Sequence, residues 1–218
     1  MTAGDGRAVE AEPIDVVERR FGARAGIIRS FADALATTGV DRGLIGPREV
    51  PRLWSRHLLN SLALEALIGP GEAVADVGSG AGLPGLVVAV ARPDLTVSLI
   101  EPSLRRVTWL EEFIGRQGIG NARVVRARAE ELRSSGERWP VVTARAVAPL
   151  ERLAGWCLPL LRPHGRLLAL KGESAQEELE AARRTLANLG AARSRVLIVS
   201  DADTGPATVV EVVGREDR

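Results

Sequence analysis

The stretch Asp76-Val77-Gly78-Ser79-Gly80-Ala81-Gly82-Leu83-Pro84-Gly85 decides the fold of this chain. It follows a short apolar run and precedes an amphipathic segment, so it lies where a strand turns into a helix. Glycines there let the chain turn tightly and let backbone N–H groups approach a ligand, and proline suits the first turn of a helix. The stretch therefore predicts a ligand-binding loop at the carboxyl end of a strand, with a glycine-rich turn that binds nothing as the alternative.

On the C-terminal side of this loop, short apolar runs alternate with amphipathic segments, as is typical of βαβ units and a parallel sheet. The last two runs are separated by only Asp201–Pro206, which leaves no room for a helix, so they form a hairpin and one strand runs antiparallel. Helices are predicted from Pro84, from Leu104, near Glu130, from Leu150 and from Ala175. The seven predicted strands are Ala73–Val77, Leu95–Ile100, Ala122–Arg126, Val141–Ala144, Arg166–Leu170, Arg195–Ser200 and Ala207–Val213.

The N-terminal side has a different pattern, with apolar residues three and four apart from Pro13 to Leu67 and a break of glycines and Pro47 between two amphipathic stretches. At 218 residues the chain suits one α/β domain and is too short for two. We therefore expect a disordered tail over residues 1–12, a helical extension over 13–70 and an α/β core over 71–218.

Composition restricts the classes of function. No apolar run approaches the ~20 residues of a membrane span, and Met1–Glu12 contains no apolar block that would make a signal peptide. The single cysteine, Cys157, fits a reducing cytosol, and a net charge of +1 argues against a protein that coats polyanions. We expect a cytoplasmic monomer with no membrane partner and no metal site.

The glycine loop is compatible with two kinds of cofactor. Residues 80–85 match G-x-G-x-x-G, and Glu101 follows about 20 residues on, as in dinucleotide-binding proteins. However, Asp76 completes a D-x-G-x-G-x-G pattern that resembles motif I of the S-adenosylmethionine methyltransferases, and the terminal hairpin resembles the reversed seventh strand of their sheet. The chain also lacks a second domain for a hydride acceptor. S-adenosylmethionine is therefore the predicted cofactor, on a Rossmann-like, seven-stranded class I methyltransferase fold, with an NAD-binding protein as the alternative.

Several residues are candidates for holding this cofactor. Glu101 ends the second strand, where a carboxylate can accept hydrogen bonds from both ribose hydroxyls, unless it is a solvated surface glutamate. Ala129 and Glu130 follow the third strand, where this superfamily holds adenine. The glycine-loop candidates are Gly78, Gly80 and Gly82.

Five motifs together resemble one family, and the resemblance covers nearly all of residues 16–213. They are Arg56-His57-Leu58-Leu59-Asn60-Ser61, the glycine loop, Arg128-Ala129-Glu130-Glu131, Ala144-Arg145-Ala146-Val147-Ala148 and Leu170-Lys171-Gly172. In this order they are similar to the glucose-inhibited division protein B family, the small-subunit ribosomal RNA guanine-N7 methyltransferases.

The resemblance implies a substrate and further contacts. It implies one guanine in the decoding-centre loop of 16S ribosomal RNA, or of the small ribosomal subunit, as the target. The implied cofactor contacts are Gly78, Leu83, Ala129, Glu130 and Arg145, with Glu101 in the ribose role. Two departures from the family stand out: Pro140 replaces its usual aspartate, and its Asn-Leu-Thr element is missing around Val40–Ile45.

Guanine N7 carries no proton, so its methylation needs no general base, and catalysis rests on positioning and electrostatics. No catalytic acid or base is therefore predicted. Basic side chains near the crevice are candidates for phosphate or guanine O6 contacts, although Arg105 and Arg106 also suit a solvated helix face. The predicted RNA contacts are Arg56, His57, Arg105, Arg106, Arg145 and Lys171. A small-molecule methyltransferase on the same fold is the other alternative.

Overall fold

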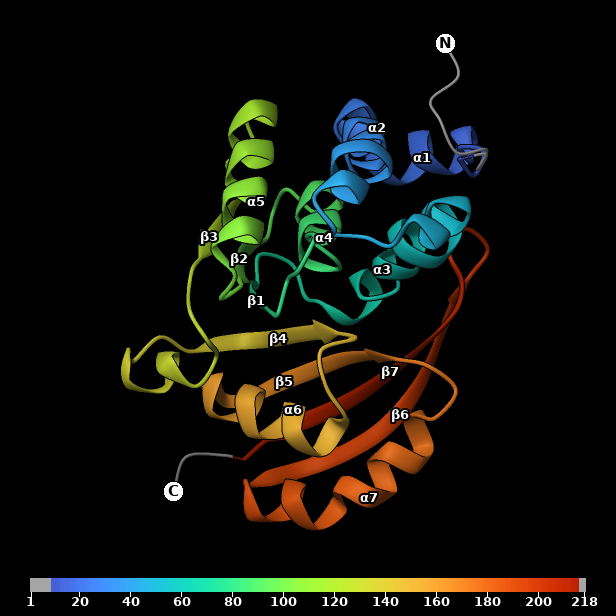
Figure 1. Cartoon of the computed structure of the whole chain (residues 1–218). Helices are drawn as coiled ribbons and strands as arrows, with labels where there is room; N and C mark the ends of the chain where they lie inside the picture. Colours follow the sequence, from blue (N-terminus) through green and yellow to red (C-terminus); the bar gives the residue numbers. More distant parts are fainter. Residues whose placement is uncertain (1–8, 216–218) are drawn as a thin grey trace.

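Alternate residues along the strands point to opposite faces of one sheet, and helices cover both faces. The computed structural model describes residues 9–215. The sheet has the strand order β3-β2-β1-β4-β5-β7-β6 (Figure 1). Its strands are β1 (Ala73–Val77), β2 (Thr96–Ile100), β3 (Ala122–Val125), β4 (Trp139–Arg145), β5 (Leu161–Lys171), β6 (Ala191–Asp201) and β7 (Gly205–Gly214).

The strand directions confirm the predicted sheet. β1 to β5 are parallel to one another, and β7 runs antiparallel to both β5 and β6. The predicted hairpin of the last two strands is therefore present, and the predicted seven-stranded methyltransferase-type sheet is confirmed. β5 begins five residues earlier than Arg166, since Leu161 already pairs with Trp139 before the register shifts near Pro140.

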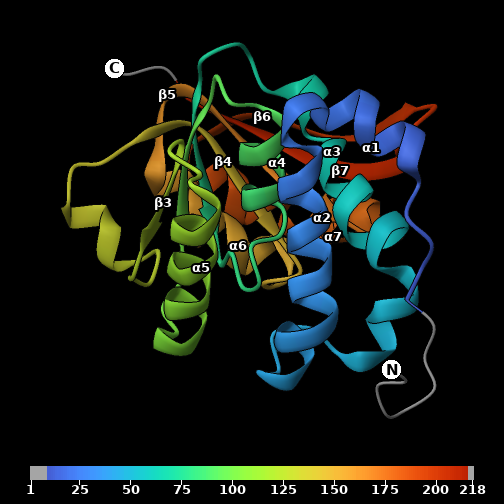
Figure 2. The same ribbon diagram turned by 90° about the horizontal axis from the view of Figure 1, so that it is seen from above.

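The helices divide into two layers, as Figures 1 and 2 show. The N-terminal helices, α4 (Gly85–Ala91) and α5 (Leu104–Gln117) cover one face, and α6 (Leu150–Cys157) and α7 (Ala175–Asn188) cover the other. Neighbouring residues of each central strand enter different cores, as the period of two requires. Val74, Val141, Leu168 and Val209 pack toward the first layer, and Ala75, Val142, Leu167 and Val210 toward the second.

The N-terminal extension is helical, as predicted, but it is built from short pieces of α-, 3₁₀- and π-helix, of which the 3₁₀ and π pieces are labelled η. These are α1 (Ile14–Phe21), η1 (Gly22–Arg24), α2 (Ala25–Ala34), η2 (Leu35–Gly39), η3 (Pro47–Arg52), η4 (Leu53–Leu59), α3 (Asn60–Leu62) and η5 (Glu65–Leu67). Residues 1–8 of the predicted tail lie outside the described residues. The tail's last residues make contacts, because Glu12 accepts a hydrogen bond from Arg29 at 2.6 Å and Glu10 accepts one from the Ser55 backbone N–H at 3.0 Å. Within residues 9–215, no helix has both the length and the apolar character to cross a membrane.

The helix predicted near Glu130 is wrong. Only a single 3₁₀ turn, η6 (Glu131–Ser134), follows β3. The hydroxyl groups of Ser134 and Ser135 donate to the carbonyl oxygens of Glu131 and Leu132, and Gly136 adopts a φ of 78°. Serine side chains that bond to nearby carbonyl groups compete with helix propagation, and a glycine in the left-handed region ends it.

Arg20 of α1 joins the N-terminal extension to the end of the sheet. Its guanidinium lies 2.6 Å from a carboxylate oxygen of Glu65 and 2.9 Å from one of Asp201, at the tip of the β6–β7 hairpin. Burial by itself would raise the pKa of Asp201, but the hydrogen bonds from Arg20 and from the backbone N–H groups of Thr204 and Asp203 lower it to about 2. The extension is thus attached to the sheet at the edge far from β3.

Arg20→Ala should lower the free energy of unfolding by about 1–2 kcal/mol, because it removes charge-assisted hydrogen bonds from partly buried carboxylates. Since the lowered pKa of Asp201 stabilises the fold only while this carboxylate is ionised, the loss should shrink as the pH falls from about 4 to 2. Urea denaturation at several pH values between 2 and 7 measures both the loss of stability and its dependence on pH. Arg183→Ala, on the exposed face of α7, is the matched control and should change little; equal effects of the two variants would exclude Arg20 as an anchor.

Candidate active site

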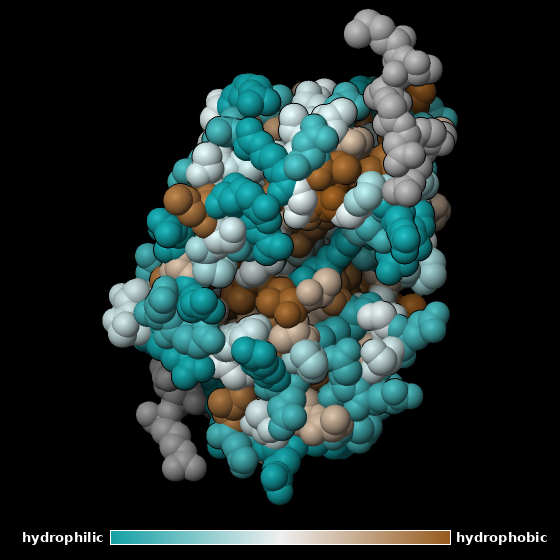
Figure 3. Space-filling view, in the orientation of Figure 1, coloured by the Kyte–Doolittle hydropathy of each residue, from teal (hydrophilic) through white to brown (hydrophobic). Residues whose placement is uncertain are grey.

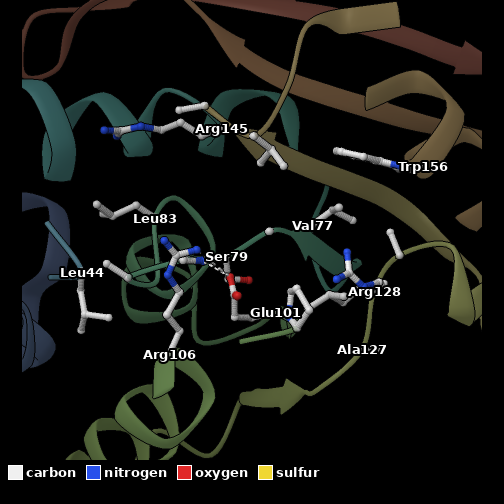
Figure 4. A pocket seen from close by; sticks show the side chains of 18 of the residues that line it. Leu44, Val77, Ser79, Leu83, Glu101, Arg106, Ala127, Arg128, Arg145 and Trp156 are labelled. Carbon is white, nitrogen blue, oxygen red and sulfur yellow. Dashed lines mark hydrogen bonds and ion pairs between the residues drawn. The ribbon is translucent and has the colours of Figure 1, made fainter. Parts of the chain in front are cut away.

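A cavity of about 530 Å³ opens at the carboxyl ends of β1, β2 and β4. This volume lies within the range of small-molecule sites, and the carboxyl edge is where open α/β sheets bind ligands. Figure 3 shows a hollow between the half of the molecule that carries α2 and α5 and the half that carries α6. In the close view, Leu44 and Leu83 lie toward one end of the cavity and Trp156 and Arg128 toward the other (Figure 4).

The glycine loop forms one wall of the cavity, and its glycines have different tasks. Gly78 and Gly80 border the cavity with φ angles of 72° and 57°. A Cβ on Gly80 would come no closer than 3.8 Å to its nearest neighbour, whereas a Cβ on Gly78 would lie 2.8 Å from a methyl group of Val147. The open space beside Gly80 can therefore receive a ligand, while Gly78 allows the opposite wall to approach.

Gly82 does not border the cavity. Its φ is 100°, and a Cβ there would meet Leu110, Leu86 and Phe31 at 3.1–3.2 Å. The third glycine of the motif thus lets the loop pack against α4, α5 and α2, and the structure gives it no direct place at the cofactor. Leu83, the next residue, does border the cavity, as expected.

Asp76, near the end of β1, connects the two ends of the glycine loop through its side chain. Its Oδ2 accepts a hydrogen bond from the backbone N–H of Gly85 at 3.0 Å, and a Cβ on Gly85 would lie only 2.6 Å from the Asp76 side chain. Full burial raises the pKa of Asp76 to about 7, against the opposing effect of this N–H group. Asp76 Oδ1 has no hydrogen-bond partner among the described residues, and the carboxyl group does not border the cavity.

Glu101, at the end of β2, is a buried residue of the cavity wall with only 2% of its surface exposed, so the surface-glutamate alternative is wrong. Its Oε2 accepts from the Gly80 N–H at 3.0 Å, and its Oε1 accepts from the Ser103 N–H at 2.9 Å. Arg106 lies 3.6 Å from the same carboxylate. A carboxylate offers about four acceptor positions, so both oxygens can still accept hydroxyl donors.

The opposite wall carries Arg145, which the N-terminal extension holds in place. Its guanidinium donates to the carbonyl oxygen of His57 at 3.2 Å and to His57 Nδ1. His57 Nε2 lies 2.8 Å from Glu49 Oε2. Because Nδ1 accepts from Arg145, the ring proton sits on Nε2 and is donated to Glu49, which makes His57 a neutral link.

The electrostatics agree with this assignment. Burial and the neighbouring Arg145 charge lower the pKa of His57, and they outweigh the opposing effect of Glu49. The pKa of Glu49 is in turn lowered by its hydrogen bond with His57. The spacing of Glu49 and His57 along the chain gave no sign of this pairing, which arises because η3 and η4 fold against each other.

Of the other predicted site residues, some border the cavity and some do not. Ala129 and Glu130 border the cavity, as does Arg106. Arg56 and Arg105 lie exposed outside it. Lys171 is turned away, because its ammonium group donates to Ala148 O and to Glu178, so the expected orientation of this lysine into the crevice is wrong.

Some cavity residues were not predicted. Trp156 of α6 is only partly buried and borders the cavity, with the Arg152 guanidinium 4.8 Å from its ring centroid. Nothing in the sequence distinguishes it from Trp109, which is buried. Leu44 to Gly46 line one end of the cavity, next to the stretch where the family's Asn-Leu-Thr element is missing.

Comparison with known proteins identifies the family. Residues 25–204 match the family model described as rRNA small subunit methyltransferase G. The ribosomal RNA small subunit methyltransferase G of Streptomyces coelicolor is 51% identical over 207 residues, covering 94% of this chain and 87% of that protein. The protein of the same name from Thermobifida fusca is 52% identical over 198 residues, covering 91% of this chain and 83% of that protein.

Solved structures at low identity share the fold. Aeropyrum pernix fibrillarin, in complex with natively bound S-adenosyl-L-methionine, aligns with a TM-score of 0.52 at 19% identity, over 73% of this chain and 75% of that one. A SAM-dependent O-methyltransferase from Thermotoga maritima gives 0.53 at 17%, over 73% and 65%. The predicted methyltransferase fold is confirmed, and the dinucleotide alternative finds no support. With a family match over most of its length and relatives about half identical to it, the chain belongs to the rRNA small subunit methyltransferase G family.

Proposed function

We propose that this chain transfers the methyl group of S-adenosylmethionine to N7 of a guanine in the decoding-centre loop of 16S ribosomal RNA. The choice of N7 as the target atom rests on the hydrogen bonds of His57. Its two ring nitrogens are both engaged, one by Arg145 and the other by Glu49. Neither nitrogen is free to take a proton from a substrate. Guanine N7 presents an in-plane lone pair and no proton, so it needs no such base.

The carboxylates of the site support the same chemistry. Among the described residues that border the cavity, these are Glu101, which holds the glycine loop, and Glu130, which is exposed. Asp76 has a raised pKa but lies behind the loop. A nucleophile that already carries a lone pair fits this wall better than an N–H or O–H group that must be deprotonated.

The residues present fit S-adenosylmethionine. When bound, it supplies a methyl group activated on a sulfonium. Glu101 would accept hydrogen bonds from the ribose hydroxyls, and the open space beside Gly80 would receive the part of the cofactor that approaches the loop. Ala129 and Glu130 would hold the adenine. Arg128, which precedes them in the chain, lies at the same end of the cavity as Trp156 (Figure 4).

The basic groups suit an anionic substrate. Arg145 uses two of its nitrogens toward His57, and a guanidinium has five N–H donors, so donors remain for guanine O6 or a phosphate. Arg106 on the opposite wall and the exposed Arg56 and Arg105 would add phosphate contacts. The family's name supports ribosomal RNA as the substrate class. We place the reaction in the cytoplasm with the ribosome; action as a monomer stays a prediction.

Incubation with radiolabelled S-adenosylmethionine and small subunits from a strain that lacks this gene should label 16S RNA at one guanine. Borohydride and aniline treatment, which cleaves at N7-methylguanosine, should cut at the labelled position. At saturating subunits the single-turnover rate should be nearly flat across neutral pH, because N7 has no proton to lose. Labelled RNA that resists cleavage, or a rate that rises about tenfold per pH unit, would move the target to another atom.

Gly80→Val should weaken the binding of S-adenosylmethionine by about 100-fold or more, because its branched side chain fills the open space and is strained at a φ of 57°. Isothermal titration calorimetry measures the affinity, and circular dichroism verifies the fold. Gly115→Ala, in an open position on α5, is the control. Wild-type affinity in folded Gly80→Val would remove the loop from the cofactor site.

His57 should give the protein a pH-dependent stability. The unfolded chain binds a proton at His57 near pH 6.5, whereas the lowered pKa keeps the folded residue neutral, so stability falls as the pH falls below about 6.5. Asp76, whose raised pKa gives the opposite slope, is common to wild type and variants. Denaturation between pH 5 and 8 should therefore show a smaller loss of stability at low pH in His57→Asn than in wild type. If the stability of His57→Asn and of wild type depended on pH in the same way, the assignment of a neutral His57 between Arg145 and Glu49 would be contradicted.

A further inference from the structure

Lys171, at the end of β5, is the only lysine in the sequence, and its side chain is 8% exposed. Its Nζ donates to the carbonyl oxygen of Ala148 at 2.8 Å and to Glu178 Oε2 at 2.7 Å. Neither partner borders the cavity, and Lys171 itself does not border it either. The two bonds occupy two of the three N–H donors of the ammonium group and hold it outside the cavity wall.

Glu178, in the first turn of α7, makes a second contact with the same loop. The oxygen that accepts the hydrogen bond from Lys171, Glu178 Oε2, also accepts one from the backbone N–H of Leu150 at 2.8 Å. Leu150 is the first residue of α6, and the preceding Pro149 makes no side-chain capping hydrogen bond. Glu178 thus supplies the acceptor that a helix start otherwise lacks. Burial tends to raise the pKa of Glu178, but Lys171 and the Leu150 N–H lower it, so the carboxylate stays ionised.

The loop held in this way forms the wall opposite the glycine loop. Ala146 borders the cavity at a φ of 53°, a left-handed conformation that is unfavourable for residues other than glycine. Such a conformation persists only where the surroundings impose it. Val147 packs against Gly78 so closely that a Cβ on this glycine would lie 2.8 Å from its methyl group. A shift of the loop would therefore change the width of the cavity.

We propose that Lys171 and Glu178 are positioning residues, which fix the β4–α6 loop so that Val147 and Arg145 stand at the correct distance from the glycine loop. The pair acts through Ala148 and Leu150, one on each side of Pro149, and touches neither cofactor nor RNA. Arg145 is held from the other side of the sheet by His57, so the loop is fixed at its start and at its end. The inference deepens the proposed function and rests on it for the identity of the bound cofactor.

Lys171→Met, which keeps most of the side-chain length and removes every donor, tests the pair. In the protein without cofactor, hydrogen–deuterium exchange of the Leu150 amide and its loop should become about tenfold faster, and affinity for S-adenosylmethionine measured by calorimetry should fall about tenfold. Lys171→Arg should restore much of both, because it restores the donors. Arg183→Met, which breaks the exposed Glu180 pair on the same helix, is the matched control and should leave both unchanged.

The outcomes separate the alternatives. Unchanged loop exchange in Lys171→Met would overturn the proposal, and so would an unchanged cofactor affinity. If instead the KM for small subunits rises while cofactor affinity stays constant, and the salt dependence of subunit binding becomes shallower, Lys171 contacts RNA and the positioning role is wrong. If the wild-type protein does not bind S-adenosylmethionine but loop exchange is still faster in Lys171→Met, the role of Lys171 and Glu178 in holding the loop is retained and the proposed cofactor is rejected.

Discussion

The hydrogen bond from the Gly85 N–H to Asp76 Oδ2 spans the glycine loop and joins the end of β1 to the start of α4. It forms only because residue 85 has no Cβ, since one there would lie 2.6 Å from Asp76 and from Leu99. With both ends of the loop fixed, the Gly80 N–H reaches Glu101 and the face beside Gly80 stays open. The buried carboxylate is costly to desolvate, as its raised pKa shows, and the close approach of α4 to the sheet offsets that cost.

The N-terminal extension is part of the site as well as a cover for the sheet. It supplies His57 and Leu44 to the cavity wall, and its Arg20 is attached to the far hairpin. Arg145 would otherwise be a partly buried cation at a strand end with few partners. Its hydrogen bonds to His57 satisfy it without neutralising it, because the imidazole is itself neutral. A positive charge is therefore kept beside the place where an anionic substrate would bind.

The two walls of the cavity are stabilised by different means. The glycine-loop wall is held by backbone N–H groups that donate to buried carboxylates, Asp76 and Glu101. The Arg145 wall is held by side chains from distant segments, His57 on one side and the Lys171–Glu178 pair on the other. This division fits a reaction without proton removal, in which the enzyme's contribution is geometry and charge placement.

The sequence by itself determined the elements, the loop and the family. Period-two and helical patterns located all seven strands, and the short gap before β7 required a hairpin, because these features depend on local residues. Local chemistry also indicated Glu101 at a strand end. The tertiary structure alone decided which neighbours these residues meet: Gly82 packs closely against α5, Lys171 pairs with Glu178, Trp156 borders the cavity, and Glu49 pairs with His57. These outcomes depend on partners far apart in the chain or on how irregular turns pack, and periodicity carries no information about either.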